Sequence, residues 1–259
     1  MVLLCVDIGN TNIVLGLYDG EELVTHWRIA TDHQKMADEY AMLILDLFQR
    51  AGQDPAGVGG LVIASVVPPL TSTFEELFRR YLGHEPLVVK ASTHSGVRIL
   101  LDSPQELGSD RAVNAVAAYH RYGGPACVVD FGTATTFDAI SAGGDYLGGA
   151  IAPGIGIAAE ALFQRTSKLP RTDLVRPPAA IGKNTVHAMQ SGLLFGYVGL
   201  VEGLVARFRA ELGPEMKVIA TGGLARLIAA ETDVIDAVEP WLTLEGLRLI
   251  WERIKGAEE

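Results

Sequence analysis

Apolar and polar residues alternate along the chain in the periods of strands and helices. Residues 2–7 have the pattern of a buried strand, and residues 13–18 and 22–29 form a hairpin around Asp19-Gly20, a strong turn dipeptide. From Tyr40 to Ala51 the apolar residues recur at helical spacing. The pattern therefore predicts a strand, a polar turn, a hairpin and a helix.

Strands and helices continue to alternate along the rest of the chain. The strand at 61–67 is closed by Pro68-Pro69, and Ser72 with Glu75 forms a capping-box pattern at the start of a second helix. Ser109 is expected to be the N-cap of a further helix. The remaining predicted strands are 87–89, 126–129, 136–140, 146–151, 217–220 and 234–238, and the remaining predicted helices are 110–122, 157–164, 185–212, 225–230 and 244–254.

The opening pattern occurs a second time. "DIGNT" begins at Asp7 behind a buried strand, and "DFGTATT" begins at Asp130 behind another, each followed by a hairpin. The two acids are 130 − 7 = 123 residues apart, about half of the chain. We therefore expect an α/β fold of two related lobes, residues 1–115 and 116–259, with no linker or low-complexity segment between them.

Composition narrows the class of protein. The chain of 259 residues is 49% hydrophobic and 20% charged, as in a soluble globular protein. Its 31 acidic and 21 basic residues give a net charge of −10 without a Lys/Arg-rich run, so nucleic acid is not an expected partner. Apolar runs reach about half of the roughly 20 residues of a membrane helix, and no basic leader precedes the first strand. We expect a cytoplasmic protein with no membrane partner, in which Cys5 and Cys127 are reduced core thiols.

The repeated acid-x-Gly-polar segment has the chemistry of a phosphate loop. Glycine allows the backbone to approach an anion, and Thr, Asn and exposed amides supply donors. A carboxylate cannot contact bare phosphate favourably, but it can do so through Mg²⁺ or another cation. The alternative for either copy alone is an ordinary turn in which Gly and Asn occupy positive-φ positions. The duplication favours the phosphate loop.

The segment resembles the superfamily of actin, heat-shock chaperone ATPases, and acetate and sugar kinases. Within it, six motifs occur in the order found in type III pantothenate kinase, and the similarity extends over essentially the whole chain. These motifs are "DIGNTNIVLG", "GSDR", "DFGTATTFD", "GGAIAPGI", "GKNT" and "ATGGLA". The resemblance implies two duplicated actin-like (ribonuclease H-like) lobes with an ATP cleft between them, and a homodimer, for which the apolar part of the long helix between Leu193 and Val205 offers an interface.

The resemblance also implies the nucleotide-binding residues. The ATP phosphate loop corresponds to Asp7, Ile8, Gly9, Asn10, Thr11, Asn12, Ile13 and Val14. In the second loop Asp130 corresponds to a monovalent-cation ligand, for K⁺ or NH₄⁺, and Thr133 to an ATP contact. Gly222 and Gly223 correspond to the adenosine-side glycines. ATP and Mg²⁺ are the implied cofactors.

Pantothenate, in the same resemblance, lies against Gly108, Ser109, Asp110 and Arg111, with Asp110 as proton acceptor, and Thr185 is a further contact. Members of the family commonly have a tyrosine seven residues before this glycine, where this chain has Leu101. An apolar wall can persist there, but a phenolic hydrogen bond cannot.

Asp110 can also be considered independently of the resemblance. If Ser109 caps the helix, Asp110 lies in the first turn, where the helix dipole stabilises a carboxylate and is expected to lower its pKa. A helix-start Asp without function has the same appearance. A weak base still suffices, because in a loose phosphoryl-transfer transition state the hydroxyl loses its proton late.

The function implied is ATP-dependent phosphorylation of pantothenate to 4′-phosphopantothenate, the first step of coenzyme A biosynthesis. Two alternatives remain open at this point: a kinase of the same fold for a sugar or other small metabolite, and a nucleotide-binding accessory protein without turnover. The presence of Asp7, Asp110 and Asp130 together favours an enzyme.

Overall fold

The computed structural model describes residues 2–90, 93 and 96–256. The chain forms two compact units. The first unit comprises Met1–Ala117 and Leu242–Glu259, and the second comprises Ala118–Trp241.

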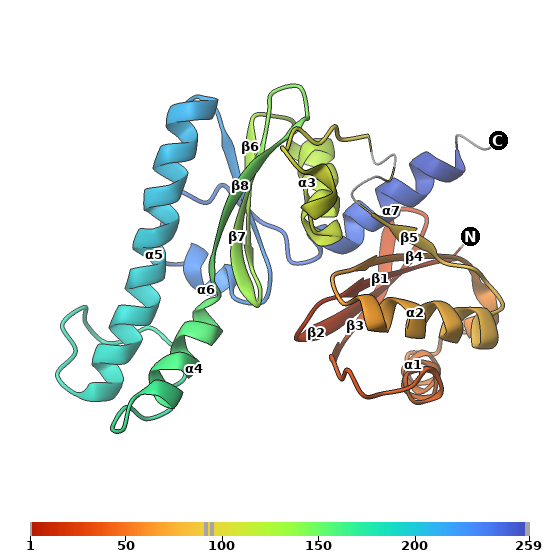
Figure 1. Ribbon diagram of the computed structural model, residues 1–259, viewed down its shortest axis with the longest axis horizontal. Coiled ribbons are helices and arrows are strands. Elements are labelled where there is room, and N and C mark those ends of the chain that lie inside the picture. The colour runs from red at the N-terminus through yellow and green to blue at the C-terminus, as the bar shows by residue number, and fades with distance from the viewer. Residues whose placement is uncertain (1, 91–92, 94–95, 257–259) are drawn as a thin grey trace. The chain divides into compact units, whose positions relative to one another are not determined.

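The first unit is built on a five-stranded sheet in the order β3-β2-β1-β4-β5 (Figure 1). Strands β1 and β2 and strands β2 and β3 pair antiparallel, whereas β4 runs parallel to β1 and to β5. The strands are β1 Val2–Ile8, β2 Asn12–Asp19, β3 Glu22–Ala30, β4 Val58–Ser65 and β5 Leu87–Val89.

Helices cover both faces of this sheet (Figure 1). Helices α1 and α2 pack with one face in a single apolar core, and α7 contacts β1, β2 and β4 from the other face. The helices are α1 Ala37–Arg50, α2 Pro68–Leu77, α3 Ser109–Tyr122 and α7 Leu242–Lys255, with short helical turns at Pro55–Gly57, Phe78–Leu82 and Pro104–Glu106.

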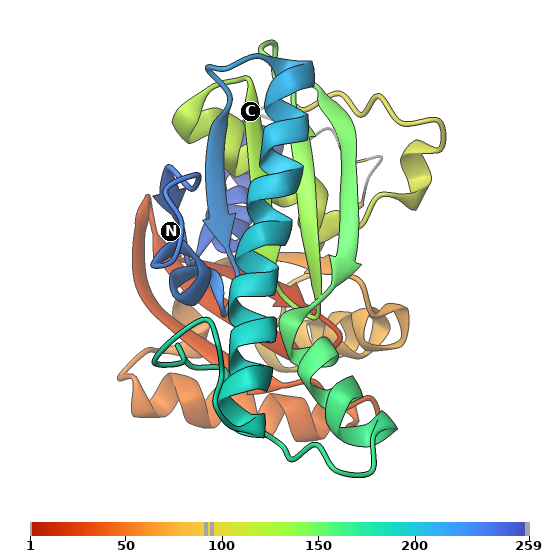
Figure 2. The same ribbon diagram turned by 90° about the vertical axis from the view of Figure 1, so that its left-hand side faces the viewer.

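The second unit contains a sheet in the order β10-β9-β6-β7-β8, and the long helix α5 lies along one face of it (Figure 2). The strands are β6 Ala126–Phe131, β7 Ala134–Ile140, β8 Tyr146–Pro153, β9 Lys217–Thr221 and β10 Ala237–Val238, and the helices are α4 Ile155–Arg165, α5 Thr185–Leu212 and α6 Ala225–Ala229.

The two sheets have the same topology. Read from the other edge, the second sheet is β8-β7-β6-β9-β10, so β1 to β5 correspond in order to β6 to β10. In both, the central strand pairs antiparallel with the next strand and parallel with a later one. This confirms the predicted α/β fold of two duplicated lobes.

Alternation along the central strands determines where the two repeated acids point. Val6 and Ile8 join the apolar core beneath α1 and α2, so the intervening Asp7 faces the opposite side of its sheet. Val129 and Phe131 likewise join the core of the second unit, and Asp130 faces away from it. In each unit the repeated acid therefore points to the face of the sheet opposite the main apolar core.

Two predicted elements differ from the observed ones. Helix α2 begins at Pro68, four residues before Ser72, because proline has no N–H to lose and fits the first turn of a helix. The predicted capping box at Ser72 and Glu75 is therefore wrong. The predicted strand at 234–238 is limited to Ala237–Val238.

The last helix lies in the first compact unit, whereas the expected lobes, 1–115 and 116–259, would put it in the second. Helix α7 belongs to the first unit, because Leu244 and Trp251 occupy the space beside Gly16 and Gly60, where a Cβ atom would lie 2.6 and 2.5 Å from them.

Helix α5 is, within the described residues, the one helix long and apolar enough by composition to cross a membrane. Part of it packs against the second sheet, as core helices of soluble proteins do, so this property is weak evidence for a membrane span. The length of uninterrupted apolar runs in the sequence underestimates the hydrophobicity of α5, because small residues separate its larger apolar residues.

Candidate active site

The first candidate phosphate loop consists of the four residues between Ile8 and Ile13, which face each other across β1 and β2. The backbone N–H of Gly9 donates to the carbonyl oxygen of Asn12 over 3.0 Å. Asn10, Thr11 and Asn12 are exposed, whereas the side chains of Ile8 and Ile13 are buried in the core. The two isoleucines can therefore contribute only backbone groups to a ligand.

Gly9 is favoured by a close approach of backbone and not by an unusual backbone angle. It is not among the glycines with positive φ, and no other type of residue in the described chain has positive φ. A Cβ atom at Gly9 would lie 3.0 Å from the carbonyl oxygen of Asn12. The alternative of an ordinary turn with positive-φ Gly and Asn is therefore not what the structure shows.

Residues Gly108–Arg111, called the acceptor segment below, are hydrogen-bonded to β4, the strand that pairs with β1 beside this loop. The hydroxyl of Ser109 accepts from the backbone N–H of Ser65 and donates to its carbonyl oxygen, both over 3.0 Å. Ser65 ends β4 opposite Ile8 of β1, and the N–H of Val66 donates to the carbonyl of Ile8 over 3.1 Å. The structure thus brings the first phosphate loop and the segment Gly108–Arg111 together at one edge of the first sheet.

Ser109 is not the helix cap that the sequence predicted. It is the first residue of α3, it is 6% exposed, and its hydroxyl is used by Ser65. The carbonyl of Gly108 accepts from the N–H of Ala112 and so begins the helix. The Ser109 hydroxyl therefore bonds the backbone of Ser65 on β4 and does not cap the N–H groups of its own helix.

Burial raises the pKa of the Asp110 carboxyl above its ordinary value. The backbone N–H of Arg111, which donates to Asp110 Oδ1 over 2.8 Å, and the Arg111 charge act in the opposite direction but do not prevail. The prediction of a lowered pKa is therefore wrong, because desolvation outweighs the helix-start contribution. A raised pKa makes this carboxylate a stronger base.

The Asp110 carboxylate also folds back over Gly108. A Cβ atom at Gly108 would lie 2.5 Å from Asp110 Oδ1. Arg111 is half-buried, and Leu101 is half-buried just before the turn Pro104–Glu106. The glycine of "GSDR" is therefore explained by the position of the carboxylate.

In the second unit, the corresponding loop is one residue shorter. Phe131 faces Thr135 across β6 and β7, and the N–H of Gly132 donates to the carbonyl of Ala134 over 3.0 Å. Thr133 is exposed, and its carbonyl accepts from the N–H of Gly154 over 3.1 Å. The backbone of the loop is thus hydrogen-bonded to Gly154, while the Thr133 side chain is exposed.

Gly222 lies against Asp130. It follows Thr221, which pairs with Asp130 in the parallel register of β9 and β6, and Gly223 comes next. Gly222 has φ +90°, and a Cβ atom there would lie 2.5 Å from Asp130 Oδ1. The structure therefore brings Asp130, Gly222 and Gly223 to one strand edge.

This edge fits a small cation with mixed carboxylate and main-chain ligands. Backbone lies close to the Asp130 carboxylate on two sides, because a Cβ atom at Gly222 would lie 2.5 Å and one at Gly132 3.6 Å from Asp130 Oδ1. No group of three His, Cys, Asp or Glu side chains suitable for a metal is found within the described ranges. A site of this kind suits a weakly bound cation better than a dedicated all-carboxylate metal centre.

Thr185 belongs to the second unit, whereas the acceptor segment belongs to the first. It is the first residue of α5, which Asn184 caps by accepting from the N–H of His187 over 2.8 Å. It also lines a cavity of about 570 Å³ whose other walls are mainly apolar residues of α4 and α5.

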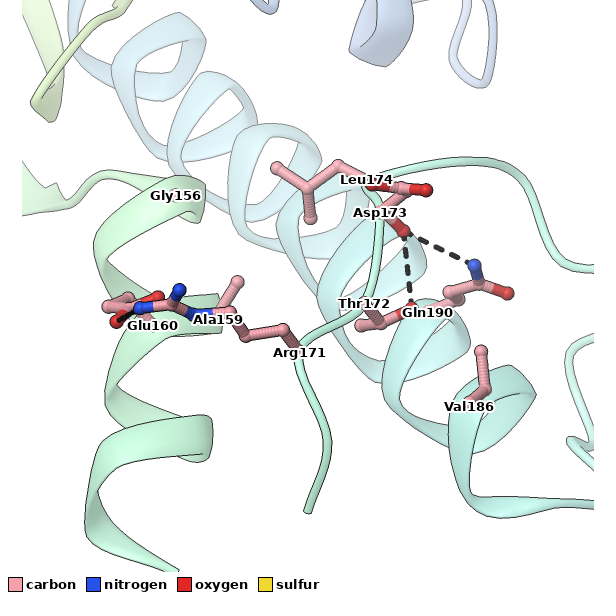
Figure 3. A pocket seen from close by; sticks show the side chains of 9 residues that line it. All are labelled: Gly156, Ala159, Glu160, Arg171, Thr172, Asp173, Leu174, Val186 and Gln190. Atoms are coloured by element: carbon pink, nitrogen blue, oxygen red, sulfur yellow. Dashed lines mark hydrogen bonds and ion pairs between the residues drawn. The ribbon is translucent and has the colours of Figure 1, made fainter.

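A neighbouring cavity of about 510 Å³ lies between α4, the segment 171–174 and α5 (Figure 3). Its polar wall contains the ion pair of Arg171 and Glu160 (2.7 Å) and Gln190, which donates to the carbonyl of Asp173 over 3.2 Å. None of the residues predicted from the sequence lines it.

Sequence reasoning missed Ser65 and Thr31, which hold the acceptor segment and the first phosphate loop. The available signal was position: each is a small polar residue at or just beyond the end of a strand, as Asp7 and Asp130 are.

Comparisons with known proteins show the family of this chain. Residues 3–207 match the sequence model of type III pantothenate kinase. The type III pantothenate kinase of Roseiflexus sp. (strain RS-1) is 59% identical over 251 residues, covering 97% of this chain and 98% of the relative. That of Moorella thermoacetica is 57% identical over 252 residues, covering 97% and 99%.

The fold alone is shared with a more distant structure. The activator of 2-hydroxyisocaproyl-CoA dehydratase from Clostridium difficile, solved with bound ADPNP, has a TM-score of 0.57 at 12% identity and covers 100% of this chain and 97% of that one. The family model and the full-length similarity of the relatives lead to one family. The chain belongs to the type III pantothenate kinases.

Proposed function

We propose that the reaction of this family, transfer of a phosphoryl group from ATP to pantothenate in coenzyme A biosynthesis, depends here on Asp110 as the base. The observation that carries this assignment is the Ser109–Ser65 bridge, which fixes the first turn of α3 beside the loop that follows β1. The carboxylate orients the terminal hydroxyl of pantothenate and accepts its proton late in the reaction.

The nucleotide is assigned to the two glycine loops. The N–H groups of Gly9 and Gly132 close their own loops, and the exposed hydroxyl and amide side chains of Asn10, Thr11, Asn12 and Thr133, with neighbouring backbone N–H groups, are assigned to the phosphates. Gly222 and Gly223 take the adenosine side. Arg111 neutralises the carboxylate of pantothenate, and Leu101 supplies an apolar wall in place of a tyrosine.

Two cations complete the proposal. Asp7 is assigned to Mg²⁺ on the phosphates and Asp130 to a monovalent cation, K⁺ or NH₄⁺. When bound, these ions offset the negative charge of the triphosphate. The chain's contribution is to hold the two carboxylates at corresponding strand ends, each on the face away from the helical core.

A cytoplasmic homodimer is also proposed, but through a different surface from that expected. Leu193, Val198, Val201 and Val205 are buried in the core of the second unit, so these side chains of the expected interface are already in contact with their own sheet. Large apolar residues are instead exposed along β8, α4, the following loop and the start of α5. These residues, called the apolar rim below, are Ile151, Ile157, Phe163, Val175, Ile181 and Val186.

The proposal is tested by ADP release in a coupled assay over a panel of acceptors. We expect turnover with pantothenate and none above background with sugars or acetate. We also expect a strong decrease in rate when K⁺ is replaced by Na⁺ or Tris at constant ionic strength. Equal rates in the three buffers would remove the monovalent cation from the proposal, and turnover with sugars alone would contradict the choice of acceptor.

A further inference from the structure

Thr31 makes two hydrogen bonds to the first phosphate loop. It directly follows β3, and its Oγ1 donates to the carbonyl oxygen of Gly9 over 2.6 Å. Its backbone N–H donates to the carbonyl oxygen of Thr11 over 3.0 Å. The pairing of β2 with β3 ends at Asn12 and Ala30, so these bonds extend the contact between the strands into the loop itself.

With the bonds of Thr31, most carbonyl groups of the loop accept a hydrogen bond within the protein. The carbonyl of Ile8 accepts from Val66, and that of Asn12 accepts from Gly9. With Thr31 bonded to the carbonyls of Gly9 and Thr11, four of the five carbonyls from Ile8 to Asn12 are engaged within the protein. A carbonyl oxygen near a phosphate is repulsive, and one that already accepts a strong hydrogen bond is not free to rotate towards the anion.

Thr31 is itself attached to the core of the first unit. Oη of Tyr40 accepts from the backbone N–H of Asp32 and donates to its carbonyl oxygen, both over 2.9 Å. Tyr40 is fully buried on α1, and its ring centroid lies 5.0 Å from that of Phe74 on α2. A continuous set of contacts therefore runs from the packed helices through residues 31 and 32 to the loop.

We infer that Thr31 is a positioning residue for the nucleotide: its hydroxyl holds the loop 9–12 in the conformation that receives the phosphate chain, and Tyr40 holds Thr31. This inference rests on the proposed assignment of the loop to ATP phosphates and adds to it a residue outside every motif of the family resemblance. Thr31 does not contact the phosphates. It acts by keeping the carbonyl of Gly9 turned inward.

The inference predicts a loss specific to phosphate-bearing ligands. Thr31→Val keeps the size and branching of the side chain and removes the hydroxyl, which leaves the Gly9 carbonyl without its donor. Because a hydrogen bond and an unsatisfied partner together change an equilibrium by about 5- to 30-fold, we expect Mg-ATP to bind that much more weakly. Adenosine, which has no phosphates, is expected to bind with unchanged affinity.

The experiment is calorimetric titration of four variants with Mg-ATP and with adenosine, together with steady-state kinetics. Thr31→Val should raise KM for ATP with a smaller change in kcat and in KM for pantothenate, and Thr31→Ser, which restores the hydroxyl, should recover at least half of the lost binding energy. Tyr40→Phe removes only the hydroxyl that holds Asp32 and should give a smaller loss of the same kind. Thr25→Val is the matched control, since Thr25 lies on β3, the strand that Thr31 follows, and no hydrogen bond of its side chain is found among the described residues.

Two results would overturn the role of Thr31: wild-type affinity for Mg-ATP in Thr31→Val, or an equal loss for ATP and adenosine, which a general structural defect would produce. Asp7→Asn separates this failure from failure of the loop assignment. If Asp7→Asn weakens Mg-ATP binding and Thr31→Val does not, only the role of Thr31 is wrong. If neither variant affects Mg-ATP binding, the assignment of the loop is wrong and the inference falls with it.

Discussion

At the scale of the residue, Asp110 is held in an environment that is unfavourable for a charge and suits its proposed role as a base. Burial raises its pKa, and the position of its carboxylate requires glycine at position 108. A carboxylate that is poorly solvated in the folded protein destabilises the fold when it is ionised, and it is also a better proton acceptor. The two effects have the same cause, so they can be measured together.

Asp110→Asn is expected to stabilise the protein at neutral pH. The folded-state pKa is raised, so the folded protein binds more protons than the unfolded chain between the ordinary and the raised pKa, and stability falls as pH rises through that window. Removing the charge should raise Tm at pH 7 by a few degrees, the effect of about 1 kcal/mol in a protein of this length. The difference from wild type should disappear as pH falls below the ordinary pKa of an Asp. Thermal unfolding across pH checks this, and a lower Tm for the variant at pH 7 would contradict the cause given for the shift.

Gly108→Ala is expected to impair catalysis without impairing nucleotide binding. The new methyl group would lie 2.5 Å from Asp110 Oδ1, so the carboxylate must move. A misplaced catalytic group costs about 10²-fold in rate, and we expect kcat to fall by roughly that factor while calorimetry gives an unchanged Kd for Mg-ATP. Gly57→Ala is the control, since a Cβ atom there meets nothing within 4 Å. A normal kcat in Gly108→Ala would show that the carboxylate position is not critical.

Ser109 illustrates what the sequence could not reveal about single residues. A serine before a helix is a good predictor of a cap, because the local geometry usually leaves its hydroxyl no better partner. Here the partner is the backbone of Ser65, 44 residues earlier. The same limit explains the wrong direction for the pKa of Asp110, since desolvation depends on the whole neighbourhood and not on position in a helix.

At the scale of the element, the repeated strand, turn and hairpin were predictable because their signals are local. Periodicity of two, strand-ending acids and Asp-Gly or Gly-Gly turns are all read within a few residues. The length of each glycine loop was not predictable, and it differs: four residues lie between the paired ends in the first copy and three in the second. Pairing register between strands fixes that length, and it follows from packing in the finished sheet.

Gly222→Ala is expected to disturb the turn between β9 and α6 in two ways. A residue other than glycine is strained at φ +90°, and its methyl group would lie 2.5 Å from Asp130 Oδ1. We expect Tm to fall by several degrees and the concentration of K⁺ that gives half-maximal rate to rise at least tenfold. Gly213→Ala also has a positive φ but meets nothing within 4 Å, so it should lower Tm alone. An unchanged K⁺ requirement in Gly222→Ala would remove this turn from the proposed cation site.

At the scale of the whole molecule, the fold class and the family follow from the sequence, whereas the place of the last helix does not. Helix α7 was predicted as a helix, but its packing beside Gly16 and Gly60 in the first unit depends on two glycines more than 180 residues away in the chain. The apolar residues of α5 were likewise predicted correctly as part of a helix, but the sequence alone could not tell which of them pack against the second sheet.

The proposed dimer is tested on the apolar rim. Ile181 is 83% exposed and Ile151 is 67% exposed, and Asp at either position would place an unpaired charge in the contact. We expect sedimentation at micromolar concentration to change from dimer to monomer in Ile181→Asp and Ile151→Asp. Met42→Asp is the matched control, because Met42 is 67% exposed on α1 of the first unit. A wild-type monomer, or a dimer that Met42→Asp alone dissociates, would contradict this surface.

The central claim is that Asp110 is the base, and its most direct test is turnover and ATP binding measured on the same preparation of Asp110→Asn. Asparagine keeps the size and an oxygen able to accept from the Arg111 N–H, so the first turn of α3 should be preserved. Loss of the proton acceptor is expected to lower kcat by about 10²- to 10⁴-fold, with the Kd for Mg-ATP unchanged. A kcat within a few fold of wild type, with the same Kd, would contradict the assignment.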